Sequence, residues 1–186
     1  MADFWTSPDT APKRNFRFLV QLGDDVVWWA KTVSTPSYDV GEVEHNFLDN
    51  KFYFPGRVSW SEVSMTLVDP VSPDAVEKTN DYVIGASVDG GPNYIIKDGD
   101  SGTVSPKTIS KSKAVAALGA VNIKILNAEG DTIEEWNLKN AFIKSAKYGD
   151  LDYSNDDLRT IELSLRYDWA TCTIGGNEQF KIPDAL

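Results

Sequence analysis

The stretch "DLRTIELSLRYDW", from Asp157 to Trp169, alternates apolar and polar side chains over most of its length. Such alternation is typical of a β-strand with one buried face and one solvent-facing face. The buried face would carry Ile161, Leu163, Leu165 and Tyr167. The opposite face would carry Glu162, Ser164, Arg166 and Asp168. This long strand near the C-terminus predicts a mainly β, antiparallel fold.

Working outward, further segments have the composition of strands, with turn residues between them. "FRFLVQL" places Phe16, Phe18, Val20 and Leu22 on one face, and a turn at residues 23–25 leads into a returning strand, "VVWWAKTVS". "VNIKILN" and "TIEEWNL" flank a hairpin turn, and "AFIKSAKY" follows as another strand. "EVSMTLVDP" alternates in the opposite phase to Val58 and Trp60, which predicts a β-bulge near Ser61 or Glu62.

One helix is expected after this strand. Ser72 is a favourable N-cap, Pro73 suits the first helical position, and Gly85 would end the helix. The predicted fold is a small antiparallel β-barrel or β-sandwich with one short helix and a long protruding hairpin. We expect an N-terminal arm at residues 1–15 and a β domain at 16–169 that contains an inserted surface loop at 87–107. Residues 170–186 would form a C-terminal extension.

The segment Tyr38 to Trp60 predicts the long hairpin, because "LDNK" supplies turn residues between two extended arms. Phe47, Phe52 and Phe54 are many large aromatic side chains for a free loop. A hairpin that reaches beyond the main sheet would place them at a boundary between subunits. Alternatively, the hairpin folds back on its own core, and the composition favours neither reading.

Charge and residue counts disfavour several functions. The 186 residues include 18 Lys and Arg but 28 Asp and Glu, a net charge of -10, so we do not expect the chain to grip nucleic acid. The lone Cys172 is expected to be a small buried hydrophobic residue, and His45 has no second His or Cys with which to bind a metal. We expect no membrane anchor, because no apolar run approaches the roughly 20 residues that span a bilayer.

Sequence motifs of catalytic, nucleotide-binding or metal-binding sites are absent or weak. The sequence contains no nucleophile elbow, phosphate-binding loop or dinucleotide fingerprint. "DGDSG" at residues 98–102 faintly resembles a calcium loop but lacks the later ligands, so a turn-rich loop is the better interpretation. We therefore expect no enzyme activity and no cofactor.

Two C-terminal stretches, "EEWNLKNAF" and "LDYSNDDLRTIELSLRYD", resemble the signature of the tail-tube proteins of contractile-tailed bacteriophages. The N-terminal half has the same order of parts, including "NKFYFPGRVSW" before the next main strand. The resemblance covers most of Phe16 to Trp169. The positions that match the signature are Trp136, Leu138, Ala141, Phe142, Leu151, Asp152, Tyr153, Tyr167 and Asp168.

This resemblance implies a structural role. Members of the family form rings of six copies, stacked into a tube inside a contractile sheath, through which DNA passes. The implied partners are further copies of the chain, the sheath protein, and baseplate and tail-terminator proteins, with DNA only as non-sticking cargo. The protein would be made in the host cytoplasm and would reside in the tail of the virion.

Two sets of residues are candidates for this role. Contacts between rings or subunits would come from the hairpin Glu42 to Pro55, through Glu42, Val43, His45, Phe47, Phe52 and Phe54. The bore should be polar and net negative so that it does not hold phosphates, and its candidate residues are Glu134, Glu162 and Asp168. Three alternatives remain: a tube of a type VI secretion or extracellular injection particle, a carbohydrate-binding β-sandwich, and an enzyme with distant carboxylates.

Overall fold

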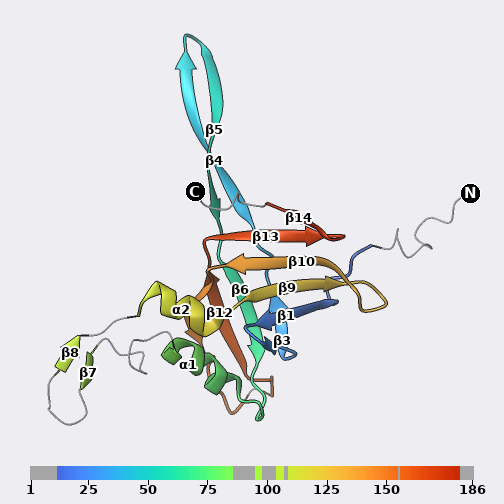
Figure 1. Cartoon of the computed structure of the whole chain (residues 1–186), viewed down its shortest axis with the longest axis vertical. Coiled ribbons are helices and arrows are strands. Elements are labelled where there is room, and N and C mark those ends of the chain that lie inside the picture. The colour runs from blue at the N-terminus through green and yellow to red at the C-terminus, as the bar shows by residue number, and fades with distance from the viewer. Residues whose placement is uncertain (1–11, 86–94, 98–103, 107–108, 155, 181–186) are drawn as a thin grey trace, which may run out of the picture.

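The computed structural model describes residues 12–85, 95–97, 104–106, 109–154 and 156–180 (Figure 1). Its six-stranded sheet has the order β14 (Asn177–Gln179), β13 (Trp169–Ile174), β10 (Thr132–Lys139), β9 (Val121–Leu126), β1 (Phe18–Leu22) and β2 (Asp25–Val26). A four-stranded sheet has the order β11 (Phe142–Lys147), β12 (Thr160–Arg166), β6 (Val63–Val68) and β3 (Ala30–Val33). All of these pairings are antiparallel.

The two larger sheets form a β-sandwich, as expected, rather than a closed barrel. One buried cluster joins them. The six-stranded sheet contributes Val20, Leu22, Val121, Ile123, Leu138 and Ala170, and the four-stranded sheet contributes Val63, Met65, Leu67, Ile161, Leu163 and Leu165. Each large apolar side chain buried in this way stabilises the fold by roughly 1.5–3 kcal/mol. The predicted alternation of β12 is confirmed, because its apolar residues all enter this core.

The first predicted hairpin is only partly correct. β1 pairs with β2 for two residues, but the chain then leaves this sheet, and β3 pairs with β6 in the other one. The change of sheet falls within two residues, because the N–H of Val27 donates to Val20 of β1 at 2.8 Å and the carbonyl of Trp29 accepts from Val68 of β6 at 2.9 Å. Phe16 was predicted on the buried face but lies before β1 and is exposed.

The predicted β-bulge near Ser61 or Glu62 is instead a break between two strands. β5 (Asn50–Trp60) ends in its own two-stranded sheet with β4 (Tyr38–Phe47), and β6 begins in the four-stranded sheet. The backbone N–H of Ser61 donates to the carbonyl of Ser37 at 2.9 Å, which holds the crossing segment. The phase of alternation changes because the chain changes sheets.

The structure contains a second helix that the sequence analysis did not predict. α1 (Ala75–Gly85) begins later than expected, and the Asp74 carboxylate, not Ser72, accepts from the backbone N–H of Glu77 at 3.0 Å. α2 (Lys111–Leu118) is capped by Ser110 and ends at Gly119, which has φ +71. The two helices lie together at one end of the sandwich (Figure 1).

The structure describes only part of the expected insertion at 87–107, and it places much of the expected C-terminal extension at 170–186 within the six-stranded sheet. Within residues 87–107 the structure describes only the two-stranded sheet of β7 (Ile95–Lys97) and β8 (Val104–Pro106), and the stretch 98–102 lies outside the described residues. The expected C-terminal extension starts inside β13, which pairs with β10, and β14 adds a further strand. Its residues up to Gln179 therefore complete the six-stranded sheet.

Candidate assembly surfaces

The hairpin of β4 and β5 extends well away from the sandwich (Figure 1). Phe47 pairs with Asn50 across a two-residue turn, in which Leu48 has φ +53. Every residue of β4 is exposed, and so is every residue of β5 except Trp60. The protruding hairpin predicted from the sequence is therefore confirmed, and it is not folded back on the core.

The register of the hairpin separates apolar from polar side chains. Val43 pairs with Phe54 and His45 pairs with Phe52, and Phe47 lies two residues further along the same face. These five residues are called the apolar face below. Its Val and Phe side chains are between 49% and 61% exposed. The opposite face carries Glu42, Glu44, Asn46, Lys51, Tyr53 and Pro55.

The two faces differ in whether their side chains have partners within the chain. On the polar face Lys51 forms an ion pair with Glu44, with 3.0 Å between Nζ and Oε1. On the apolar face, by contrast, large side chains remain open to solvent. Exposed apolar patches of this kind mark sites of interaction. Five of the six residues predicted for contacts between subunits lie on the apolar face, whereas Glu42 lies on the polar one.

A close backbone approach shapes the hairpin near its base. The register shifts between Val40 and Glu42, which leaves Gly41 in a bulge. A Cβ on Gly56 would lie 3.0 Å from the carbonyl oxygen of Gly41, whereas one on Gly41 would lie 3.4 Å from that of Arg57. A glycine at position 56 thus has a steric reason, because a side chain there would press against the backbone of Gly41.

Aromatic side chains connect the base of the hairpin to the sandwich. Trp60 contacts Tyr38 at 5.4 Å, Tyr167 at 6.0 Å and Phe180 at 5.9 Å, measured between ring centroids. Phe180 also stacks on Trp136 of β10 at 6.3 Å. Burial raises the pKa of the Tyr167 hydroxyl to about 12, so this ring stays neutral. Two signature positions, Trp136 and Tyr167, therefore hold the hairpin in place.

The other signature residues divide between core and surface. Leu138 and Ala141 are buried, and Phe142 is partly buried at the start of β11. Leu151 and Tyr153 are exposed. Asp152 accepts hydrogen bonds from the backbone N–H and hydroxyl of Ser154 at 2.9 and 2.8 Å, and these bonds lower its pKa.

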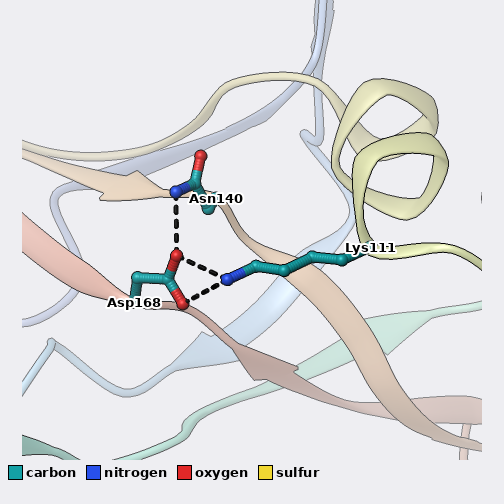
Figure 2. A network of polar contacts seen from close by, with 3 residues as sticks. All are labelled: Lys111, Asn140 and Asp168. Carbon is teal, nitrogen blue, oxygen red and sulfur yellow. Dashed lines mark hydrogen bonds and ion pairs between the residues drawn. The ribbon is translucent and has the colours of Figure 1, made fainter.

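Asp168 belongs to a small polar network (Figure 2). Lys111 Nζ lies 2.8 Å from Oδ1 and 2.7 Å from Oδ2 of Asp168, and the side-chain amide of Asn140 donates to Oδ2 at 2.8 Å. Partial burial would raise the pKa of Asp168, but these hydrogen bonds outweigh it and lower the pKa. Asp168 thus ties the start of α2 to the turns that precede β11 and β13.

Glu134 is not on the solvent-facing side of its strand. A register shift follows Thr132, and Glu134 then shares the face of Trp136 and Leu138, with its side chain only 12% exposed. It pairs with Lys13 and accepts from the Trp136 indole. Desolvation would raise the pKa of Glu134, but these two donors lower it overall. The solvent-facing side of β9 and β10 instead carries Asn122, Lys124, Glu135 and Asn137.

Glu162 does lie on an open surface, the outer face of the four-stranded sheet. It forms an ion pair with Lys147 at 3.6 Å. On the same face Glu62 pairs with Lys144 and accepts from Ser164 at 2.9 Å, and Arg166 lies 3.7 Å from it. The hydrogen bond from Lys144 is the main cause of the lowered pKa of Glu62. This face therefore carries paired charges of both signs, not the net negative charge expected.

Within the part of the chain that the structure describes, no group of three or more His, Cys, Asp or Glu could hold a metal ion. Cys172 is buried, as predicted, and burial raises the pKa of its thiol. Among the described residues, no helix has the length and apolar character required to cross a membrane.

Comparison with known proteins gives structural relatives only. No family model matches the sequence. No curated protein matches it either. A chain of the cryo-EM structure of the anti-feeding prophage tube-terminating cap is 18% identical, with a TM-score of 0.63 over 88% of this chain and 92% of that chain.

Two further solved structures are similar. A chain of the extended sheath–tube complex of the PVC extracellular contractile injection system is 19% identical, with a TM-score of 0.59 over 90% of this chain and 95% of that one. A crystal structure of an Hcp protein is 12% identical, with a TM-score of 0.51 over 88% of this chain and 97% of that one. The chain therefore has the fold shared by these solved structures, as its resemblance to tail-tube proteins predicted.

Proposed function

We propose that this protein is a structural subunit of a tube, not an enzyme, and that six copies form a ring that stacks on further rings. In a contractile phage tail the tube would be the conduit for DNA inside the sheath. A second candidate is the tube of an extracellular injection or secretion particle, which is favoured by the particles that contain the structural relatives. The sheath protein, the baseplate and the tube terminator are the proposed partners in either particle.

The observation that carries this proposal is the apolar face of the protruding hairpin. A soluble monomer gains nothing from exposing four large apolar side chains on one side of a ribbon. Burying each of them against a neighbour would contribute roughly 1.5–3 kcal/mol. Because the hairpin extends away from the sandwich, it can reach a copy in the next ring (Figure 1).

Contacts within a ring would come from the four-stranded sheet. Its two edge strands, β11 and β3, run in opposite directions, because the three pairings between them are all antiparallel. The β11 edge of one copy can therefore join the β3 edge of the next in a further antiparallel pairing. Such joining covers open sheet edges, and a head-to-tail contact of this kind closes into a ring.

The outer face of the four-stranded sheet is then our candidate for the wall of the bore. It presents short polar side chains, among them Ser64, Thr66 and Ser164, together with the ion pairs of Glu62 and Glu162. Paired charges leave few free cations to bind phosphate. The charges named on this face are two carboxylates and three cations, and each cation lies within ion-pair distance of a carboxylate, so the wall would grip DNA less strongly than unpaired cations would.

The test is electron microscopy and sedimentation of the purified chain over a wide range of concentrations. We expect uniform rings or tubes for the unmodified protein. Phe54→Ala should weaken or abolish them, whereas Tyr53→Ala, which removes a neighbouring aromatic from the polar face, should not. Both variants should unfold at nearly the same temperature as the unmodified chain, because both side chains are outside the core.

A chain that stays strictly monomeric at high concentration, even beside an initiating baseplate, would contradict the proposal. If Phe54→Ala lowered the unfolding temperature in parallel with assembly, the side chain would be part of the fold and the interface assignment would fail.

A further inference from the structure

A pocket of about 610 Å³ opens at the base of the hairpin, beside α2. Three aromatic side chains line it, Trp60, Phe142 and Tyr167. Val58 of β5 also lines the pocket and is 55% exposed. Aromatic rings pack favourably edge-to-face or stacked on one another. The pocket is therefore suited to an aromatic side chain from another molecule, and it is called the aromatic pocket below.

The lining of the aromatic pocket is net positive, although the protein as a whole is acidic. Among the described lining residues, Lys111 and Arg166 are cations and Asp168 is the one carboxylate. Asp168 holds Lys111 at 2.7 Å, whereas Arg166 lies 3.7 Å from Glu62, which is too far for a hydrogen bond. The lining therefore favours a partner that brings negative charge.

The loop after β11 has the complementary character. Residues 150–154 carry two carboxylates and no cation. Tyr153 projects fully into solvent, and Leu151 is 82% exposed. The backbone N–H and the hydroxyl of Ser154 donate to Asp152 at 2.9 and 2.8 Å. The turn that presents the Tyr153 ring therefore exists before any partner binds.

The aromatic pocket and this loop lie at opposite ends of the same pair of strands. Phe142 pairs with Arg166 at the pocket end of β11 and β12, and Lys147 pairs with Glu162 toward the other end. The chain leaves β11 after Lys147 and enters β12 at Thr160, so the loop lies beyond that second end. The hairpin extends from the pocket end, since β5 lines the pocket (Figure 1). If the hairpin points toward the next ring, the loop of that ring faces the pocket.

We infer that Tyr153 of one copy enters the aromatic pocket of a copy in the adjacent ring. Its ring packs against Trp60 and Tyr167, and the acidic loop around it faces the positive lining. This contact rests on the proposed function, because it needs rings that stack head-to-tail. It is separate from the apolar face of the hairpin. It also fixes the rotation of one ring on the next, because the pocket receives the side chain at one place only.

The first arm of the test is a disulfide cross-link between Tyr153→Cys and Val58→Cys, carried in one chain. Under mild oxidation, assembled protein should give a ladder of covalent oligomers in a denaturing gel. The ladder should run past six copies, because head-to-tail stacking does not close on itself. The control is Val71→Cys with Val58→Cys, since Val71 is 98% exposed and follows β6 at the same end of the sheet as the loop. The native Cys172 is buried and should not contribute.

The second arm changes the anchor itself. Tyr153→Ala should raise the concentration needed for stacking by at least about tenfold, because buried aromatic anchors dominate the affinity of interfaces. Tyr153→Phe keeps the ring and should stack nearly as well as the unmodified chain. Val58→Trp fills the pocket from its own side and should weaken stacking as Tyr153→Ala does. Both positions are outside the core, so the unfolding temperature should hardly change.

Four results would overturn the inference. Stacked rings without a ladder, or stacking that Tyr153→Ala leaves unchanged, would remove this contact and leave the proposed function intact. A ladder that ends at six copies would place the contact within a ring. A ladder that forms only after deletion of residues 181–186 would assign the pocket to the chain's own C-terminal segment, since Phe180 contacts Trp60. A complete absence of rings and ladder would reject both the proposed function and this contact.

Discussion

The backbone of Gly56 lies so close to that of Gly41 that a Cβ on Gly56 would stand 3.0 Å from the Gly41 carbonyl oxygen. This is tighter than nine in ten real Cβ contacts, so Gly56→Ala should move the two strands apart by a few tenths of an ångström, a shift that the length of the hairpin would magnify at its tip. We expect weaker assembly with little change in the unfolding temperature, because the hairpin lies outside the core. Sedimentation and thermal unfolding would measure the two effects.

Gly41→Ala is the matched control for this prediction. Its Cβ would lie 3.4 Å from the Arg57 carbonyl oxygen, an ordinary contact, and both glycines occupy the same bulge. Equal loss of assembly in the two variants would show that the spacing at Gly56 is not what orients the hairpin.

The ion pair of Glu134 predicts a loss of stability in acid. Lys13 and Trp136 hold the pKa of Glu134 below its ordinary value of 4.5, so the folded chain binds this proton less readily than the unfolded chain. The stabilisation is complete above the ordinary value and is lost as the pH falls through the lowered folded pKa. Glu134→Gln should therefore flatten the acid limb of a plot of unfolding free energy against pH.

Lys13→Met gives an independent check of the same group, because it removes the strongest donor to Glu134 while leaving the carboxylate in place. It should flatten the acid limb in the same direction. An acid limb that is unchanged in both variants would mean that other groups control the acid sensitivity.

The network in Figure 2 predicts a measurable coupling between Lys111 and Asp168. In a double-mutant cycle with Lys111→Met and Asp168→Asn, denaturant unfolding should give a coupling free energy of about 0.2–1 kcal/mol. The value is modest because both side chains are partly exposed, and it should decrease in high salt. Purely additive effects at low salt would show that the ion pair contributes nothing to holding α2.

Sequence periodicity was sufficient to predict the strands that have one buried face and one exposed face. β12 is the clearest case, and the hairpin of β4 and β5 was located by its turn residues. The contact residues stay a prediction, although five of the six share one face of the hairpin. Glu42, the first residue of the predicted hairpin segment, pairs with Pro55 on the opposite face, because neighbours along a strand point to opposite sides.

Other features depend on contacts between distant segments and left little local signal. The returning strand changes sheets between Val27 and Trp29, yet both are buried with Trp28 exposed between them, as in an unbroken strand, so the local pattern does not mark the change. α2 is short and rich in small residues, so its apolar pattern is weak. Glu134 reads as solvent-facing from its charge, but the register shift after Thr132 and its pairing with Lys13 place it at the rim of the core.

The even number of strands in the sheet with free edges β11 and β3 has a consequence for symmetry. Each added copy repeats the same up-and-down order without a mismatch, so strand direction would permit a ring of any size. The number of copies is therefore not encoded in hydrogen bonding along the edges. In the proposed ring it would follow from the angle at which each sheet meets the next, so substitutions that change sheet curvature should alter the diameter of the proposed tube before they prevent its formation.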